Sequence, residues 1–207
     1  MLLLVGLGNP GAEYAHSRHN AGFRVIERLK REWKLGPDRA RFQGITNDGA
    51  IGGEKIVALR PQTYMNESGR SVGAAMRFFK LTPDDVVVFH DEADLAFGKV
   101  RFKTGGGSAG NNGIKSVTAH ITDAYHRVRI GVGRSESAAM RNHVLGDFSK
   151  AEEADLDKLI DAMAKNADLL ARRDYERYMS KLALTTNSPR NAGPKKSGTD
   201  NDDDKDS

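Results

Sequence analysis

A short, uninterrupted apolar run opens this chain and limits the folds that it can adopt. The run extends from Leu2 to Leu7 and contains no charged or polar side chain, and glycines follow closely. It is too short to span a membrane and is typical of a β-strand buried on both faces. A strand of this kind needs packed elements on each side, as in an α/β architecture.

Strand and helix patterns alternate along the rest of the chain. Apolar residues recur at helical spacing after Asn20, which we expect to cap a helix. Two strands near 100–102 and 128–132 alternate apolar with basic residues, so each is expected to have a polar face. The other predicted segments are strands at 55–59 and 86–89 and helices at 72–79, 114–121 and 150–170. The alternation predicts an α/β fold, a single-domain sandwich with a twisted mixed sheet flanked by helices.

The chain is predicted to contain one catalytic domain and a tail. A length of 207 residues suits one domain. Residues 1–184 carry the strand and helix patterns, whereas residues 185–207 are polar, rich in acidic and basic side chains and nearly devoid of apolar ones. Such a composition does not compensate for the entropy of ordering, so we expect a disordered tail.

Composition excludes several classes of site. Cysteine is absent, which rules out disulfides, a thiolate nucleophile and cysteine-bound zinc, and no recognised histidine frame predicts another metal. The N-terminal segment lacks the features of a signal peptide or membrane span, so we expect a cytoplasmic protein.

Positive charge is concentrated in one part of the chain. The net charge is +4, but residues 99–134 contain seven basic residues against one acidic residue. This segregation is compatible with a polyanionic partner or with an unevenly charged solvated surface.

A glycine motif after the first strand is misleading. Gly6, Gly8 and Gly11 match the spacing of a dinucleotide-binding turn. Pro10 lies inside the motif and lacks the N–H group that a pyrophosphate would need, and no helical pattern begins there. We therefore expect no nucleotide cofactor, and a rigid loop whose turn presents Asn9.

His19 and Asp91 are the candidate catalytic pair. His19 lies between this loop and the next helix, and Asp91 follows the strand at 86–89. A buried carboxylate selects the tautomer of a histidine and stabilises the charged ring during proton transfer. Because cysteine and a G-x-S-x-G elbow are both absent, water activated by His19 is the simplest nucleophile. A surface or capping histidine is the alternative interpretation.

Further stretches carry side chains suited to substrate binding. Asn66 precedes a helix, where capping is the alternative role, and Met65 offers an apolar wall or fills the core. The glycine-rich run at 105–113 permits close backbone approach to a ligand. Lys103 before that run is suited to phosphate, and Asn112 within it to an amide or ester carbonyl.

Four motifs, taken in order, resemble the bacterial peptidyl-tRNA hydrolase family over residues 2–184. They are Val5–Gly11 with Tyr14 and Arg18–Asn20, then Thr63–Gly69, His90–Glu92 and Lys103–Gly113. The resemblance implies hydrolysis of the ester between a peptide, or N-blocked aminoacyl group, and the 3′ end of tRNA, which recycles tRNA from peptidyl-tRNA released by ribosomes.

The resemblance also implies roles for individual residues. His19 would be the general base and Asp91 its supporting carboxylate, in a monomer without metal or cofactor that contacts the tRNA acceptor stem and 3′ end. The remaining roles divide between the peptide and the tRNA. On the peptide side, Asn9 and Asn66 would position water or recognise the peptide, and Asn112 would add a polar group. On the tRNA side, Tyr14 and Tyr64 would contact tRNA, and Lys103 and Arg129 would meet its phosphates.

The chain departs from the family pattern at a few positions. Asn111 stands where the family often has histidine, Ala93 where leucine is usual, and Tyr64 where phenylalanine is frequent. Ser108 and Ala109 replace a glycine-and-polar pattern. These departures leave the contacts of the glycine-rich loop open.

Three functions are compatible with the sequence. The first is this hydrolase, the second an RNA-binding protein on the same fold without activity, and the third a nucleotide-dependent oxidoreductase. The presence of His19, Asp91 and three candidate asparagines disfavours the second, and Pro10 disfavours the third.

Overall fold

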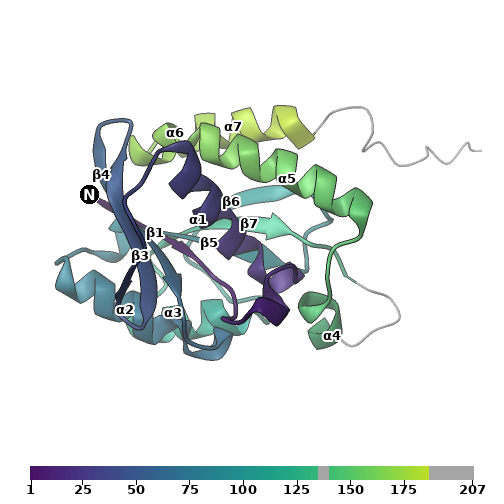
Figure 1. Ribbon diagram of the computed structural model, residues 1–207, viewed down its shortest axis with the longest axis horizontal. Helices are drawn as coiled ribbons and strands as arrows, with labels where there is room; N and C mark the ends of the chain where they lie inside the picture. Colours follow the sequence, from purple (N-terminus) through teal and green to yellow (C-terminus); the bar gives the residue numbers. More distant parts are fainter. Residues whose placement is uncertain (135–139, 187–207) are drawn as a thin grey trace, which may run out of the picture.

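The computed structural model describes residues 1–134 and 140–186, which form a seven-stranded sheet with helices on both faces (Figure 1). The strands are β1 (Leu2–Gly6), β2 (Arg39–Arg41), β3 (Gly44–Ile51), β4 (Glu54–Pro61), β5 (Val86–Glu92), β6 (Val100–Thr104) and β7 (His126–Gly131). Their order is β2-β3-β4-β1-β5-β7-β6. The central strands β4, β1, β5 and β7 are parallel, and the outer strands pair antiparallel, so the predicted mixed sheet is confirmed.

The sequence pattern did not predict the hairpin of β2 and β3. Strand β3 contains the polar segment Thr46–Gly49, which has no apolar alternation. It forms because its backbone pairs with the whole of β4, from Gly44 opposite Pro61 to Ile51 opposite Glu54. Pairing with a neighbouring strand thus outweighs the weak local preference of these residues.

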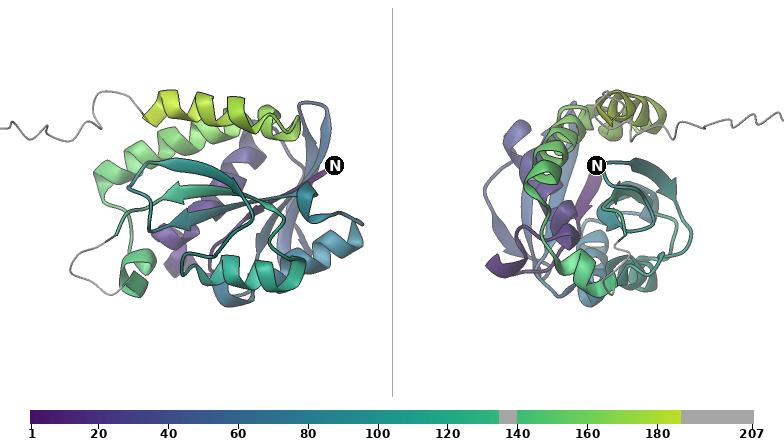
Figure 2. Two further views of the ribbon diagram at one scale, coloured as in Figure 1. Left: turned by 180° about the vertical axis from the view of Figure 1, so that it is seen from behind. Right: turned by 90° about the vertical axis from the view of Figure 1, so that its right-hand side faces the viewer.

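Helices cover both faces of the sheet (Figures 1 and 2). They are α1 (Ala21–Glu32), α2 (Ser68–Phe78), α3 (Asn112–Ile121), α4 (Met140–Leu145), α5 (Lys150–Lys165), α6 (Ala167–Ala171) and α7 (Tyr175–Thr186). Helices α1, α5, α6 and α7 share one apolar core, and α2 and α3 share the other. Leu2 and Leu4 of β1 join the first core, whereas Leu3 and Val5 join the second, so burial on both faces is confirmed.

One helix ends earlier than predicted, and one polar face is less exposed than its pattern suggests. The helix expected to continue to residue 170 breaks at Asn166, whose Nδ2 donates to the carbonyl oxygen of Ala162 at 2.8 Å. The same oxygen accepts from the backbone nitrogen of Asn166 at 3.2 Å, so this asparagine adds a side-chain bond to the last turn of α5. Strand β7 has the predicted polar face, formed by Arg127 and Arg129, but little of it meets water: Arg127 is 2% exposed and the side chain of Arg129 is 23% exposed. Alternating basic residues do not always mark a face exposed to water. The guanidinium of Arg127 is bonded to backbone carbonyl oxygens of the protein instead.

The C-terminal helix α7 reaches Thr186, so the first two residues of the predicted tail, 185 and 186, are helical. The rest of the predicted tail, residues 187–207, lies outside the described residues. Among the residues that the structure describes, no helix is both long enough and apolar enough to cross a bilayer.

Helix α1 packs against the sheet at very short range because glycines meet there. A Cβ atom placed on Gly22 would lie 2.3 Å from the carbonyl oxygen of Phe89 and 2.5 Å from the backbone nitrogen of Leu7. One placed on Gly6 would lie 2.2 Å from the carbonyl oxygen of Gly22. Close helix–strand packing therefore explains Gly6 without a bound dinucleotide.

We predict that Gly22→Ala lowers the free energy of unfolding by about 2 kcal/mol or more. Overlap with backbone atoms outweighs the gain of roughly 0.5–1 kcal/mol that alanine normally brings to a helix interior. Urea denaturation measures the change. Gly107→Ala is the matched control, because its added Cβ would meet no atom within 4 Å. Equal stabilities for the two variants would contradict the packing argument.

Candidate active site

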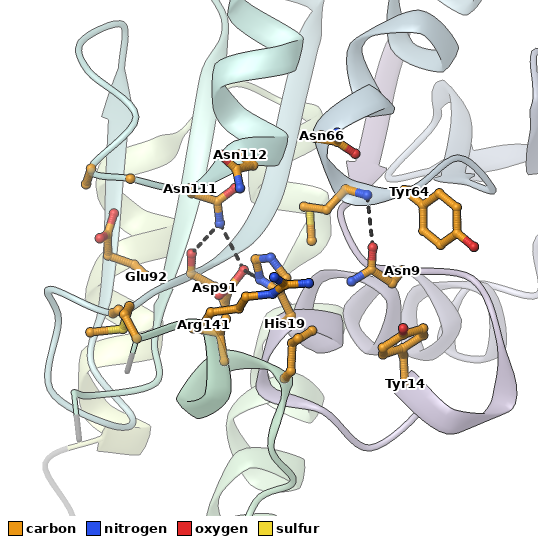
Figure 3. Close-up of a pocket in the computed structure, with 17 residues that line it drawn as sticks. Asn9, Tyr14, His19, Tyr64, Asn66, Asp91, Glu92, Asn111, Asn112 and Arg141 are labelled. Atoms are coloured by element: carbon orange, nitrogen blue, oxygen red, sulfur yellow. Dashed lines mark hydrogen bonds and ion pairs between the residues drawn. The ribbon is translucent and has the colours of Figure 1, made fainter. Parts of the chain in front are cut away.

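His19 and Asp91 meet at the carboxyl edge of the parallel strands. His19 lies in the short 3-10 helix η2 (Arg18–Asn20) that leads into α1, and Asp91 lies near the end of β5. The Nδ1 atom of His19 is 2.8 Å from Oδ1 of Asp91, whose side chain is 2% exposed (Figure 3). The ionised carboxylate only accepts hydrogen bonds, so Nδ1 donates and Nε2 remains the ring atom able to take up a proton.

Asn20 does not have the expected role. Its side chain makes no capping hydrogen bond to α1. Instead Oδ1 of Asn20 accepts from the backbone nitrogen of Asn9 at 2.8 Å, and Nδ2 donates to the carbonyl oxygen of Asn9 at 3.0 Å. Asn20 therefore holds the loop after β1 against the start of α1.

Asn9 is held so that one polar atom stays available. Its Oδ1 accepts from the backbone nitrogen of Met65 at 2.9 Å, and the residue is 8% exposed. The Nδ2 atom of Asn9 makes no hydrogen bond to another described residue. This nitrogen points toward His19 (Figure 3). The site therefore contains a fixed N–H donor beside the candidate base.

A pocket of about 610 Å³ opens over this pair. It collects eight of the ten residues predicted from the sequence, namely Asn9, Tyr14, His19, Tyr64, Met65, Asn66, Asp91 and Asn112. Asn66 does not cap α2, which begins at Ser68 after Glu67. Met65 is buried, whereas Tyr64 is 62% exposed at the pocket wall, as an aromatic side chain that contacts a ligand would be.

One wall of the pocket comes from a helix that the sequence pattern did not predict. Met140, Val144 and Leu145 of α4 line it together with Arg141. Met140 and Val144 are four residues apart, which is the spacing of one helical face, but a helix of six residues is too short for its pattern to stand out. The remaining lining residues outside the predictions are Glu92, Ala93, Ala109, Gly110 and Asn111.

Lys103 and Arg129 lie in a neighbouring cavity of about 200 Å³ and not in the main pocket. Glu92 and Ala109 line both cavities, so the two are adjacent. The complete lining of the smaller cavity is His90, Glu92, Lys103, Gly107, Ser108, Ala109, Arg127 and Arg129. A ligand that fills the main pocket and continues around Glu92 would meet these basic side chains.

The basic residues of this region are not a uniform strip on the surface. Arg127 of β7 donates to the carbonyl oxygens of Gly106 and Gly107, both at 2.8 Å, and so holds the glycine-rich loop against the sheet. The Nε of Arg129 lies 3.1 Å from the buried carboxylate of Glu92. Several of the cations counted in the sequence thus have protein partners already.

A sequence model of the peptidyl-tRNA hydrolase family matches residues 3–191 of the chain. The chain belongs to this family. The peptidyl-tRNA hydrolase of Parvibaculum lavamentivorans is 53% identical over 204 residues, covering 98% of this chain and 100% of that protein. That of Beijerinckia indica is 55% identical over 183 residues, covering 88% of this chain and 92% of the other.

The fold agrees with the family. A crystal structure of peptidyl-tRNA hydrolase from Acinetobacter baumannii matches with a TM-score of 0.83 at 38% identity. The match covers 88% of this chain and 94% of that chain. The expected α/β sandwich and the expected family are both confirmed.

His90 is a buried, neutral histidine that lines the smaller cavity of this peptidyl-tRNA hydrolase family member. Burial lowers its pKa to about 4, and the neighbouring Arg127 and Arg129 act in the same direction. Its Nδ1 lies 2.8 Å from the carbonyl oxygen of Asp91 and must donate, because a carbonyl only accepts. Its Nε2 is buried without a partner among the described residues.

We predict that His90 makes stability fall on acidification. An unfolded histidine binds a proton near pH 6.5, so between pH 6.5 and 4 the unfolded chain holds a proton that the native chain does not. His90→Asn retains a donor for the carbonyl oxygen of Asp91. Between pH 7 and 4.5, its free energy of unfolding should fall by about 2 kcal/mol less than that of the unmodified protein. Urea denaturation across this range measures it. His16→Asn, at an exposed position, should leave the slope unchanged.

Proposed function

We propose that this protein hydrolyses the ester between a peptide, or N-blocked aminoacyl group, and the 3′ end of tRNA. The observation that carries the proposal is the His19–Asp91 pair in a pocket that also holds a fixed amide donor, within a chain of this family. The reaction recycles tRNA from peptidyl-tRNA released by ribosomes.

The chemistry uses water as nucleophile. Nε2 of His19 removes a proton from a water molecule as its oxygen attacks the ester carbonyl carbon. The carboxylate of Asp91 stabilises the resulting imidazolium. The tetrahedral intermediate then expels the ribose oxygen, which takes the proton back from His19, and a peptide acid and a free tRNA result.

The amide groups provide substrate selection. Nδ2 of Asn9 is placed to hold the water, while Asn66 and Asn112 line the pocket where the peptide would lie. Amide side chains recognise the N–H and C=O of the amide that blocks the amino acid. A free aminoacyl group has an amino group in place of that amide. The apolar wall formed by Met65 and α4 suits side chains of the peptide.

The tRNA part of the substrate would extend along the adjacent cavity. Lys103 and Arg129 are proposed to meet phosphates there, and Tyr14 and Tyr64 to contact the 3′ end at the pocket mouth. Phosphate contacts of this kind fix register and make affinity dependent on salt. We further propose that the protein acts as a cytoplasmic monomer, without metal or cofactor.

Replacement of His19 by alanine should abolish turnover while tRNA binding persists. The base is lost but the phosphate contacts remain, so hydrolysis of N-blocked aminoacyl-tRNA should fall by at least 1,000-fold, as expected for removal of an activating base. The unmodified protein should release the blocked acid only, with EDTA present or absent. Turnover by His19→Ala at the unmodified rate would assign the base elsewhere, and binding without any hydrolysis by the unmodified chain would favour an RNA-binding protein.

Lys103→Ala should weaken tRNA binding and reduce its dependence on salt. Loss of one phosphate contact lowers the slope of log affinity against log salt by about one. Fluorescence titration with tRNA at several salt concentrations measures both. Lys55→Ala is the matched control, because Lys55 is exposed near the start of β4, at the amino end of the parallel strands and away from the candidate pocket. If both variants keep the same slope, Lys103 does not contact phosphate.

A further inference from the structure

Asn111 lies at the junction between the catalytic pair and helix α3. It is the N-cap residue of α3, and its Oδ1 accepts from the backbone nitrogens of Gly113 at 2.9 Å and Ile114 at 3.1 Å. An amide has one acceptor atom and one donor group at opposite sides. Once Oδ1 is bound to these two N–H groups, the direction of Nδ2 is determined.

Nδ2 of Asn111 points at Asp91 (Figure 3). It lies 3.0 Å from Oδ1 of Asp91, the same oxygen that accepts from His19, and 3.1 Å from the carbonyl oxygen of Asp91. In the part of the chain that the structure describes, His19 and Asn111 are the two side chains bonded to this carboxylate. Asn111 therefore binds both the side chain and the backbone of Asp91, the carboxylate that supports His19.

We propose that Asn111 is a positioning residue that holds the carboxylate of Asp91 in the orientation used by His19. The inference rests on the proposed function of that pair. With two donors on one oxygen, the carboxylate plane is held in place and the imidazole of His19 is aligned with it. Without Nδ2, a buried carboxylate with one remaining side-chain partner can rotate, and the ring loses its fixed direction.

The same residue connects the base to the substrate side of the pocket. Asn112 follows it as the first residue of α3 and lines the pocket. Because Asn111 caps that helix, it also holds the backbone on which Asn112 is mounted. Two functions of one side chain, capping and positioning, can therefore be separated by the choice of replacement.

The replacement Asn111→Ser separates capping of α3 from positioning of Asp91. Serine is a good N-cap acceptor, so Tm should stay within about 2 °C of that of the unmodified protein. Its shorter side chain does not carry the N–H group that reaches Asp91. We expect kcat on N-blocked aminoacyl-tRNA to fall roughly tenfold with KM nearly unchanged, as for loss of a residue that orients a catalytic group.

Asn111→Ala removes the cap as well. It should show the same loss of kcat, a higher KM because Asn112 is less well held, and a lower Tm. Ser149→Ala is the matched control for capping, because Ser149 caps α5 through an equivalent bond to Glu152 and lines neither cavity. It should lower Tm and leave kcat unchanged.

The outcomes distinguish the two levels of inference. If the unmodified chain hydrolyses the substrate and Asn111→Ser keeps its kcat, positioning by Asn111 is wrong while the proposed function stands. If kcat falls in Ser149→Ala as much as in Asn111→Ser, the effect is one of stability and the inference is overturned. If the unmodified chain shows no hydrolysis, the proposed function itself fails.

Discussion

The organisation of this site depends on a buried carboxylate. Asp91 is placed at the end of a central strand with almost no exposure to water, and a charge in that position is costly unless it is hydrogen-bonded. His19 and Asn111 supply those bonds from two segments that lie far apart in the sequence. Satisfying one charge thus brings together the start of α1, the start of α3 and the end of β5.

Short amide side chains give the site its rigidity. Asn20 binds both backbone groups of Asn9, and Asn9 in turn binds the backbone of Met65. Each contact joins a loop to an element that packs on the sheet, so these hydrogen bonds hold the loops in place. Groups held in this way lose little freedom when substrate binds, as the proposed general-base mechanism requires.

Charge in this protein has two uses that composition alone does not separate. Arg127 is buried and supports the glycine-rich loop through two carbonyl oxygens, whereas Lys103 is exposed beside the smaller cavity. Arg129 is paired with Glu92, which lines both cavities. A count of basic residues between 99 and 134 therefore overestimates the positive charge available to a polyanion.

The family, the α/β class and the strand buried on both faces could be predicted from the sequence, because unbroken apolar runs and local motifs depend on neighbours along the chain. The sequence also indicated His19 and Asp91 as candidates. Three features emerge only when the chain is folded: Asn20 binds Asn9, Asn111 binds Asp91 and α4 lines the pocket. Asn20 and Asn9 are 11 positions apart, and Asn111 and Asp91 are 20 apart, so neither contact can be read from a local pattern. An asparagine before a helix has the same local pattern whether it caps that helix or bonds elsewhere.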